Sequence, residues 1–212
     1  MVRRTPREVR IFVEGGGDDN ASLKAECRKA FKKLLERAGF AGRLPSVIAC
    51  GGRQAAYEQF KQACREDRYD AVLLVDSEAL VSQSSPWEHV RRRVGDGWER
   101  PAEASDDDLH FMAQCMEAWI VADRAGLRGY FGEALHDKAL PARADLEQVA
   151  KLDLYHALSE ATQRTSKGRY GKGRDSFKLL AVVDPAAIRR GCPTWGERFF
   201  ADLARRLPAV RG

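Results

Sequence analysis

The chain has 212 residues, of which 44% are hydrophobic and 32% are charged, and its formal net charge is +5. This length suits one well-packed domain, and the mixture of both charge signs argues against wholesale disorder. The longest apolar runs, such as Ala71–Val75 and Leu179–Val183, have five residues. A membrane span needs roughly 18, so we expect no membrane helix.

The cysteines and the N-terminal residues exclude further classes of protein. Five cysteines, at positions 27, 50, 64, 115 and 192, are odd in number and form no CxxC pair, which does not fit a disulfide scaffold or a zinc site. The basic residues Met1–Arg7 are followed by no apolar segment, so we expect no secretion signal. These features together predict a soluble, cytoplasmic protein.

The first half of the chain alternates short β-rich segments with amphipathic helices. Apolar runs bounded by glycines predict strands, and helical spacing of apolar residues predicts the helices between them. Helices a dozen residues long between successive strands imply parallel strands with right-handed crossovers. The expected elements are a strand at Glu8–Val13, a glycine turn at Glu14–Asn20, a helix ending at Gly39, a strand at Leu44–Cys50, a helix at Gln54–Arg65 and a strand at Ala71–Val75.

The second half is expected to be mostly helical. Its expected elements are a short helix at Pro86–Arg93, a polar loop at Val94–Asp108, a fourth strand at Leu109–Ala113, and helices at Cys115–Arg124, Asp145–Val149, Leu152–Ala161 and Trp195–Leu207. The predicted fold class is α/β, with a central four-stranded, mainly parallel sheet flanked by helices. We place the core in residues 1–124 and a helical extension in residues 125–212, packed on the core as one unit.

Acidic residues follow three of the predicted strands. They are Glu14 and Asp18 after the first strand, Asp76 and Glu78 after the third, and Glu117 after the fourth. Because parallel strands end at one edge of a sheet, these side chains are expected to converge. Two such charges about 4 Å apart repel by about 4 kcal/mol at an effective dielectric constant of about 20, which a divalent cation relieves. Oxygen ligands without histidine or cysteine favour Mg²⁺ or Mn²⁺. Each acid alone also has a structural explanation, as a helix start or a strand end.

A glycine-interleaved basic loop runs through Ser166–Arg174. Glycines let a backbone follow a chain of phosphates, cations contact it, and a tyrosine can stack on an exposed base. The predicted nucleic-acid contacts are Lys167, Arg169, Tyr170, Lys172 and Arg174, together with Arg53 at the start of the second helix. A flexible surface loop is the alternative. The spacing of a Walker A loop is absent, so we expect no nucleotide hydrolysis by this chain.

Two sequence blocks resemble the Toprim pattern of topoisomerases, DnaG-type primases, OLD-family nucleases and RloB-like proteins. They are Ile11-Phe-Val-Glu-Gly15, where a strand ends in Glu-Gly, and Leu73-Leu-Val-Asp-Ser-Glu78, where an apolar strand ends in an acid pair. More closely, the whole chain resembles a bacterial Toprim-like family, domain of unknown function 4276. The matching blocks are Val13–Asp19, Leu74–Glu78, Gln114–Trp119 and Lys167–Lys172.

The resemblance implies a role for each acid. Glu14 would act as general acid/base or as first metal ligand, and Asp76 would hold Mg²⁺. Glu78 stands where many Toprim proteins carry a second Asp, which leaves open whether one metal or two are bound. Asp18 matches an acid of OLD-type nucleases, and Glu117 resembles their additional late carboxylate.

The late lysine of OLD-type nucleases, which stabilises charge on the transferred phosphate, corresponds here to Lys167 or Lys172. The prediction is therefore a Mg²⁺-dependent nuclease that cleaves phosphodiester bonds in DNA or RNA. Similar small Toprim proteins act in antiphage defence beside a separate ATPase, so an ATPase partner of the AAA or ABC type is implied. Two alternatives stay open: a non-catalytic module that binds nucleic acid or a partner, and a small-molecule phosphoryl-transfer enzyme. The oligomeric state is open as well, a homo-oligomer included.

Overall fold

The computed structural model describes residues 7–18 and 20–207 of the chain. The strands are β1 (Glu8–Glu14), β2 (Ser46–Gly51), β3 (Tyr69–Asp76) and β4 (Leu109–Met112). The α-helices are α1 (Ala21–Leu35), α2 (Arg53–Cys64), α3 (Pro86–Arg92), α4 (Glu117–Ala122), α5 (Arg124–Phe131), α6 (Lys151–Thr162), α7 (Ser176–Leu180), α8 (Pro185–Gly191) and α9 (Trp195–Arg206). A π-helical turn continues α1 at Glu36–Phe40, and 3₁₀ turns lie at Asp106–Asp108, Asp137–Ala139 and Leu146–Gln148.

The four strands form one parallel sheet in the order β2-β1-β3-β4. This confirms the predicted α/β class with a four-stranded central sheet flanked by helices. The unbroken apolar run of β3 has the sequence that a strand covered on both faces needs, and its residues Val72–Val75 are fully buried. The central position of β1 and β3 determines where the acidic residues that follow them lie.

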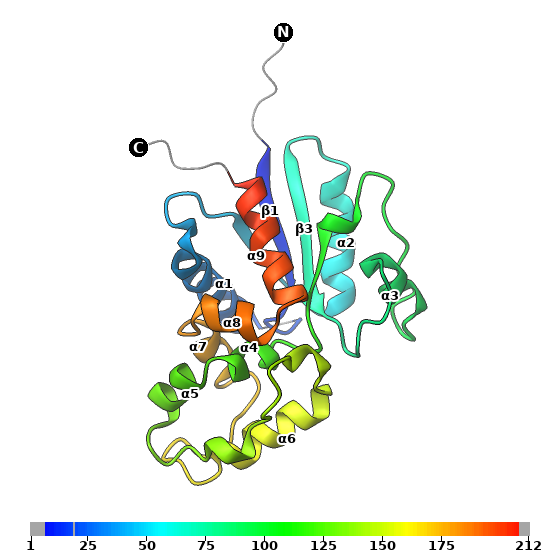
Figure 1. The fold of residues 1–212 in the computed structure, drawn as a ribbon. Helices are drawn as coiled ribbons and strands as arrows, with labels where there is room; N and C mark the ends of the chain where they lie inside the picture. Colours follow the sequence, from blue (N-terminus) through cyan, green and yellow to red (C-terminus); the bar gives the residue numbers. More distant parts are fainter. Residues whose placement is uncertain (1–6, 19, 208–212) are drawn as a thin grey trace.

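Each face of the sheet has its own hydrophobic core, because successive side chains of a strand point to opposite faces. Ile11 belongs to a core that also contains Phe31 of α1 and Phe199 of α9. Its neighbour Phe12 points the other way and packs edge-on against Phe60 of α2. Figure 1 shows α2 and α3 beside β3, with α1 on the other side of the sheet.

Helices α4 to α8 lie beyond the carboxyl ends of the strands (Figure 1). Side chains of α4 and α6 belong to the same hydrophobic core as Ile11, so the predicted core and extension share buried residues. Buried Glu147 accepts hydrogen bonds from the N–H groups of Thr194, Trp195 and Gly196, at 3.1, 2.6 and 3.1 Å. A carboxylate at this position caps the N-terminus of α9 and joins it to the turn at Leu146–Gln148.

Two helix predictions are wrong in detail. The helix expected at Cys115–Arg124 is shorter, spanning only α4, and the separate helix α5 begins at Arg124, where the Oδ1 atom of Asp123 accepts the N–H of Gly126 at 2.9 Å. The helix expected at Asp145–Val149 is a single 3₁₀ turn, because Asp145 caps it and Val149 is already extended. The helices α5, α7 and α8 were not predicted.

Three parts of the chain lie outside the described residues. They are Met1–Pro6, which carry most of the basic segment discussed above, Asp19 of the glycine turn, and residues 208–212 of the predicted extension. Within residues 7–18 and 20–207, no helix combines the length and the apolar character needed to cross a membrane.

Candidate metal centre

Two neighbouring strands carry acidic residues to the same edge of the sheet. Glu14 is the last residue of β1 and Asp76 is the last of β3, and these strands pair directly. Glu78 follows with φ of +65°, in the left-handed region that non-glycine residues rarely adopt. One ligand oxygen from each of Glu14, Asp76 and Glu78 lies within 4.8 Å of the others. The structure thus brings together three of the five predicted metal ligands, and we call these three residues the carboxylate cluster.

Asp76 is the most buried member of the carboxylate cluster, with 5% of its surface exposed. Its Oδ1 atom accepts a hydrogen bond from the N–H of Met116 at 2.9 Å. Burial, followed by the charges of Glu14 and Glu117, raises the pKa of Asp76 to about 8, although Lys151 and Lys172 act in the opposite direction. Ionised Asp76 is therefore disfavoured mainly by its burial, and then by the neighbouring carboxylates.

Lys151, the first residue of α6, lies against the carboxylate cluster. Its Nζ atom donates to Oε1 of Glu78 at 2.5 Å and lies 3.6 Å from Oδ2 of Asp76. Burial alone would lower the pKa of Lys151, but the charges of Asp76 and Glu78 outweigh it and raise the pKa above its ordinary value. This lysine was not predicted, because no motif surrounds it and 73 positions separate it from Glu78.

Arg53, predicted as a nucleic-acid contact, forms ion pairs inside the protein. It donates to Oε2 of Glu14 at 3.2 Å and to the backbone carbonyl of Asp76. Its other nitrogens donate to the carboxylate of Asp96 at 2.8 and 2.7 Å, and its guanidinium lies over the ring of Trp98. With 13% of its side chain exposed, Arg53 links the carboxylates of Glu14 and Asp96 inside the protein.

Glu117, in the first turn of α4, is fully buried and lies outside the group of three. Its Oε1 atom accepts a hydrogen bond from the hydroxyl of Tyr170 at 2.8 Å. Its Oε2 atom has no hydrogen-bond partner in the described part of the chain. Burial and the charge of Glu117 raise the pKa of Tyr170 far above its ordinary value, so that the tyrosine stays a neutral donor. The sequence predicts that Tyr170 stacks on an exposed base. In the structure its hydroxyl forms a hydrogen bond inside the protein, to Glu117.

Asp18 lies apart from the carboxylate cluster, on the glycine turn after β1. Its Oδ1 atom accepts the N–H of Gly52 at 2.5 Å, which joins this turn to the start of α2. Within the turn, Gly16 has φ of +92°, and a Cβ atom there would lie 2.7 Å from the Cα atom of Lys24. The turn therefore needs glycine so that α1 can pack closely beside the cluster.

A cavity of about 220 Å³ adjoins the carboxylate cluster and is lined by Glu14, Asp76 and Lys172, among others. Lys172 is exposed, and its Nζ atom donates to the hydroxyl of Tyr155 at 2.9 Å. Of the two lysines proposed for catalysis, Lys172 is thus the one that lines the cavity with the acids.

The other members of the basic loop have partners away from this cavity. Lys167 lies 4.8 Å from the ring centre of Tyr130. Arg169 donates to side chains of α6 and of the residue after it, at 3.1 and 3.0 Å. Arg174 pairs with the carboxylate of Asp175 at 2.7 Å. Arg169 and Arg174 therefore help to hold the loop on the protein.

Residues 13–204 match the family described as Domain of unknown function (DUF4276). The chain belongs to this family. The matched range contains the whole carboxylate cluster as well as Lys151 and Lys172. Comparison with curated proteins and with solved structures found no match.

The residues of this DUF4276 member fit a hard divalent cation. Glu14, Asp76 and Glu78 offer carboxylate oxygens, the donors that Mg²⁺ and Mn²⁺ prefer. Burial and the charges of Glu14 and Glu117 raise the pKa of Asp76 even with Lys151 present, and a bound cation would favour its ionised form. The Oε2 atom of buried Glu117 has no hydrogen-bond partner among the described residues. The carboxylate cluster would hold the cation.

Proposed function

We propose that this chain is a Mg²⁺- or Mn²⁺-dependent nuclease that cleaves phosphodiester bonds in DNA or RNA. One observation carries the proposal: the ligand oxygens of Glu14, Asp76 and Glu78 lie within 4.8 Å of one another. They do so at the carboxyl edge of a parallel sheet, where such folds bind ligands. Lys172 lines the adjoining cavity. A relationship to the Toprim nucleases is part of this proposal and rests on the sequence resemblance.

The proposed chemistry divides between the acids and the lysines. A cation held by the carboxylate cluster would supply a Lewis acid and lower the pKa of a water molecule. The water oxygen bonds to the phosphorus as the P–O bond to the leaving nucleotide oxygen breaks. Half-buried Glu14, which Arg53 holds at the cavity wall, accepts the proton of the water, and solvent protonates the leaving oxygen. Lys151 and Lys172 both bring positive charge near Asp76 and neutralise charge that develops on the phosphate.

The proposed setting is the cytoplasm, in antiphage defence, with a separately encoded ATPase of the AAA or ABC type. Two sequence features support it. The chain resembles small Toprim effectors, and it lacks Walker A spacing, so nucleotide hydrolysis falls to another protein.

Cleavage assays with isosteric variants test the proposal. Purified protein should cut DNA or RNA with Mg²⁺ or Mn²⁺ and lose this activity with EDTA. Glu14→Gln and Asp76→Asn should each lower the rate by about 10²-fold or more. Asp67→Asn, whose side chain is 97% exposed, is the matched control and should cut like the wild type. No cleavage with either metal, alone or with the separately encoded ATPase, would refute the proposal, as would cleavage unchanged by Glu14→Gln.

One observation favours the alternative of a non-catalytic binding module. Arg53 and Lys151 already pair with Glu14 and Glu78, so the protein itself compensates part of the negative charge. Calorimetric titration with Mn²⁺ separates the two cases: heat that Asp76→Asn abolishes supports the metal centre, and the absence of heat supports the module. Turnover of mononucleotides or phosphate esters, but not of polymers, would identify the small-molecule enzyme.

A further inference from the structure

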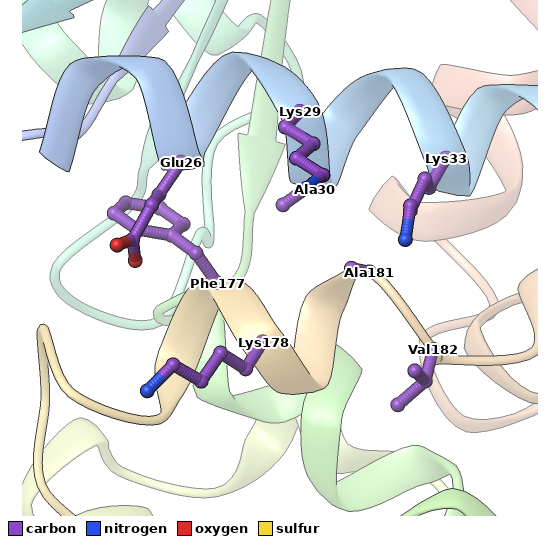
Figure 2. A pocket seen from close by; sticks show the side chains of 8 residues that line it. All are labelled: Glu26, Lys29, Ala30, Lys33, Phe177, Lys178, Ala181 and Val182. Atoms are coloured by element: carbon purple, nitrogen blue, oxygen red, sulfur yellow. The ribbon is translucent and has the colours of Figure 1, made fainter. Parts of the chain in front are cut away.

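A second cavity lies in the groove between α1 and α7 (Figure 2). Its volume is about 360 Å³, and its apolar lining is formed by Ala30 of α1 and by Phe177, Ala181 and Val182. Phe177 also lines the cavity at the carboxylate cluster. The two cavities therefore have Phe177 in common as a lining residue.

Lysines stand on both walls of this groove. Figure 2 shows Lys29 and Lys33 on α1 and Lys178 on α7. All three side chains are exposed, and none of them forms an ion pair within the described ranges. Residues four apart share one face of a helix, so Lys29 and Lys33 lie about 6 Å apart along the axis of α1. Glu26 also lines the groove, on the side of Phe177 (Figure 2).

The groove brings together two basic segments that are far apart in the sequence. The first is α1 with its continuation, which contains two acids, Glu26 and Glu36, and six cations: Lys24, Arg28, Lys29, Lys32, Lys33 and Arg37. The second is the basic loop followed by α7, which carries Lys178. Because α1 packs against α7, Lys29 and Lys33 of the first segment and Lys178 of the second line one groove.

We propose that the groove between α1 and α7 binds the phosphate backbone of a nucleic acid and leads it to the carboxylate cluster. This inference rests on the proposed function and identifies the surface along which the polymer lies. Exposed, unpaired ammonium groups on two walls match a polyanion. The apolar lining matches sugar and base surfaces. The shared Phe177 joins this surface to the cavity that Lys172 lines.

Salt-dependent binding tests the groove separately from catalysis. Fluorescence anisotropy with labelled single-stranded DNA and RNA is measured in the Asp76→Asn background, where no cleavage is expected. The triple variant Lys29→Ala, Lys33→Ala, Lys178→Ala should bind more weakly. The slope of log affinity against log salt should fall by about 2, because each phosphate contact contributes about 0.7 for single strands.

A second triple variant provides the matched control. Arg65→Ala, Arg91→Ala and Arg92→Ala also remove three exposed positive charges, but at the end of α2 and on α3, which cover the other face of the sheet. This variant should keep the wild-type slope. Glu26→Gln should tighten binding by about twofold, because it removes a negative charge from the groove.

The possible results separate the groove from the nuclease. Three results overturn the inference about the groove, whatever the cleavage assay shows. They are an unchanged salt slope in the groove variant, an equal decrease of the slope in the control variant, and no binding to any polymer. Groove-dependent binding without cleavage by the wild type supports the groove and refutes the nuclease. Tighter binding of a polyglutamate peptide than of nucleic acid assigns the groove to an acidic protein and overturns the inference.

Discussion

Replacing Asp76 by asparagine should stabilise the metal-free protein at alkaline pH. Asparagine keeps the shape of the side chain, and its carbonyl oxygen can still accept the N–H of Met116. The pKa of Asp76 is about 8 in the folded protein, against an ordinary value of 3.8. Between these values the folded protein keeps a proton that the unfolded chain has lost, so the wild type loses stability as pH rises from about 4 to about 8.

The size of the effect follows from the pKa shift. One pKa unit corresponds to about 1.4 kcal/mol, so the shift of Asp76 from 3.8 to about 8 sets an upper limit of about 6 kcal/mol. Water and side chains that rearrange around the ionised carboxylate reduce this figure. We expect Asp76→Asn to exceed the wild type by at least about 2 kcal/mol at about pH 8.5, which raises the melting temperature by about 4–8 °C.

Thermal unfolding followed by circular dichroism in EDTA, from about pH 4 to pH 9, measures this difference. The two proteins should melt together near pH 4 and diverge as pH rises, while Asp67→Asn follows the wild type. Adding Mn²⁺ should raise the melting temperature of the wild type and leave that of Asp76→Asn unchanged. If the two proteins melted in parallel at every pH, the argument that burial and neighbouring carboxylates raise the pKa of Asp76 would be refuted.

Three further variants test other parts of the site. Glu78→Gly should leave the metal-free protein about 1 kcal/mol more stable than Glu78→Ala, since both lose the carboxylate but only glycine accepts φ of +65° without strain; equal denaturant midpoints would contradict this. Lys151→Ala should lower the free energy of unfolding of the metal-free protein by about 1–2 kcal/mol, because the ion pair with Glu78 is lost. In a melting experiment, Mn²⁺ should restore most of this stability. A melting temperature of the metal-free variant equal to that of the wild type would count against the ion pair. Gly16→Ala should lower the free energy of unfolding by about 2 kcal/mol more than Gly17→Ala does. A Cβ atom at Gly16 would lie 2.7 Å from the Cα atom of Lys24, whereas a Cβ atom at Gly17 would lie no closer than 3.8 Å to any neighbour. Urea unfolding compares the two glycine variants, and the reverse order would exclude this contact as the reason for the glycine.

The sheet and the position of its acids could be predicted from the sequence because both depend on local patterns. Apolar runs separated by amphipathic helices determine parallel strands, and a strand as apolar as β3 has to be covered on both faces. An acid at the end of such a strand then lies at the carboxyl edge. This argument places Glu14 and Asp76 together without knowledge of any contact.

Contacts between distant segments could not be predicted in the same way. Nothing in the sequence around Lys151 indicates that the start of α6 packs over the edge of the sheet. The pairing of Tyr170 with Glu117 depends equally on how the basic loop folds back. The short helices α5, α7 and α8 contain too few turns for a periodic pattern, and capping residues such as Asp123 and Asp184 determine where two of them begin.

One face of the sheet is completed only by the end of the chain. Ile11 near the N-terminus is buried in the same core as Phe199 and Leu203, which belong to the last helix. A nascent polypeptide that still lacks α9 exposes this face to water, and the strands that carry Glu14 and Asp76 are not yet held in place. For an enzyme of the proposed kind, the active site becomes rigid only once α9 has packed onto this face of the sheet.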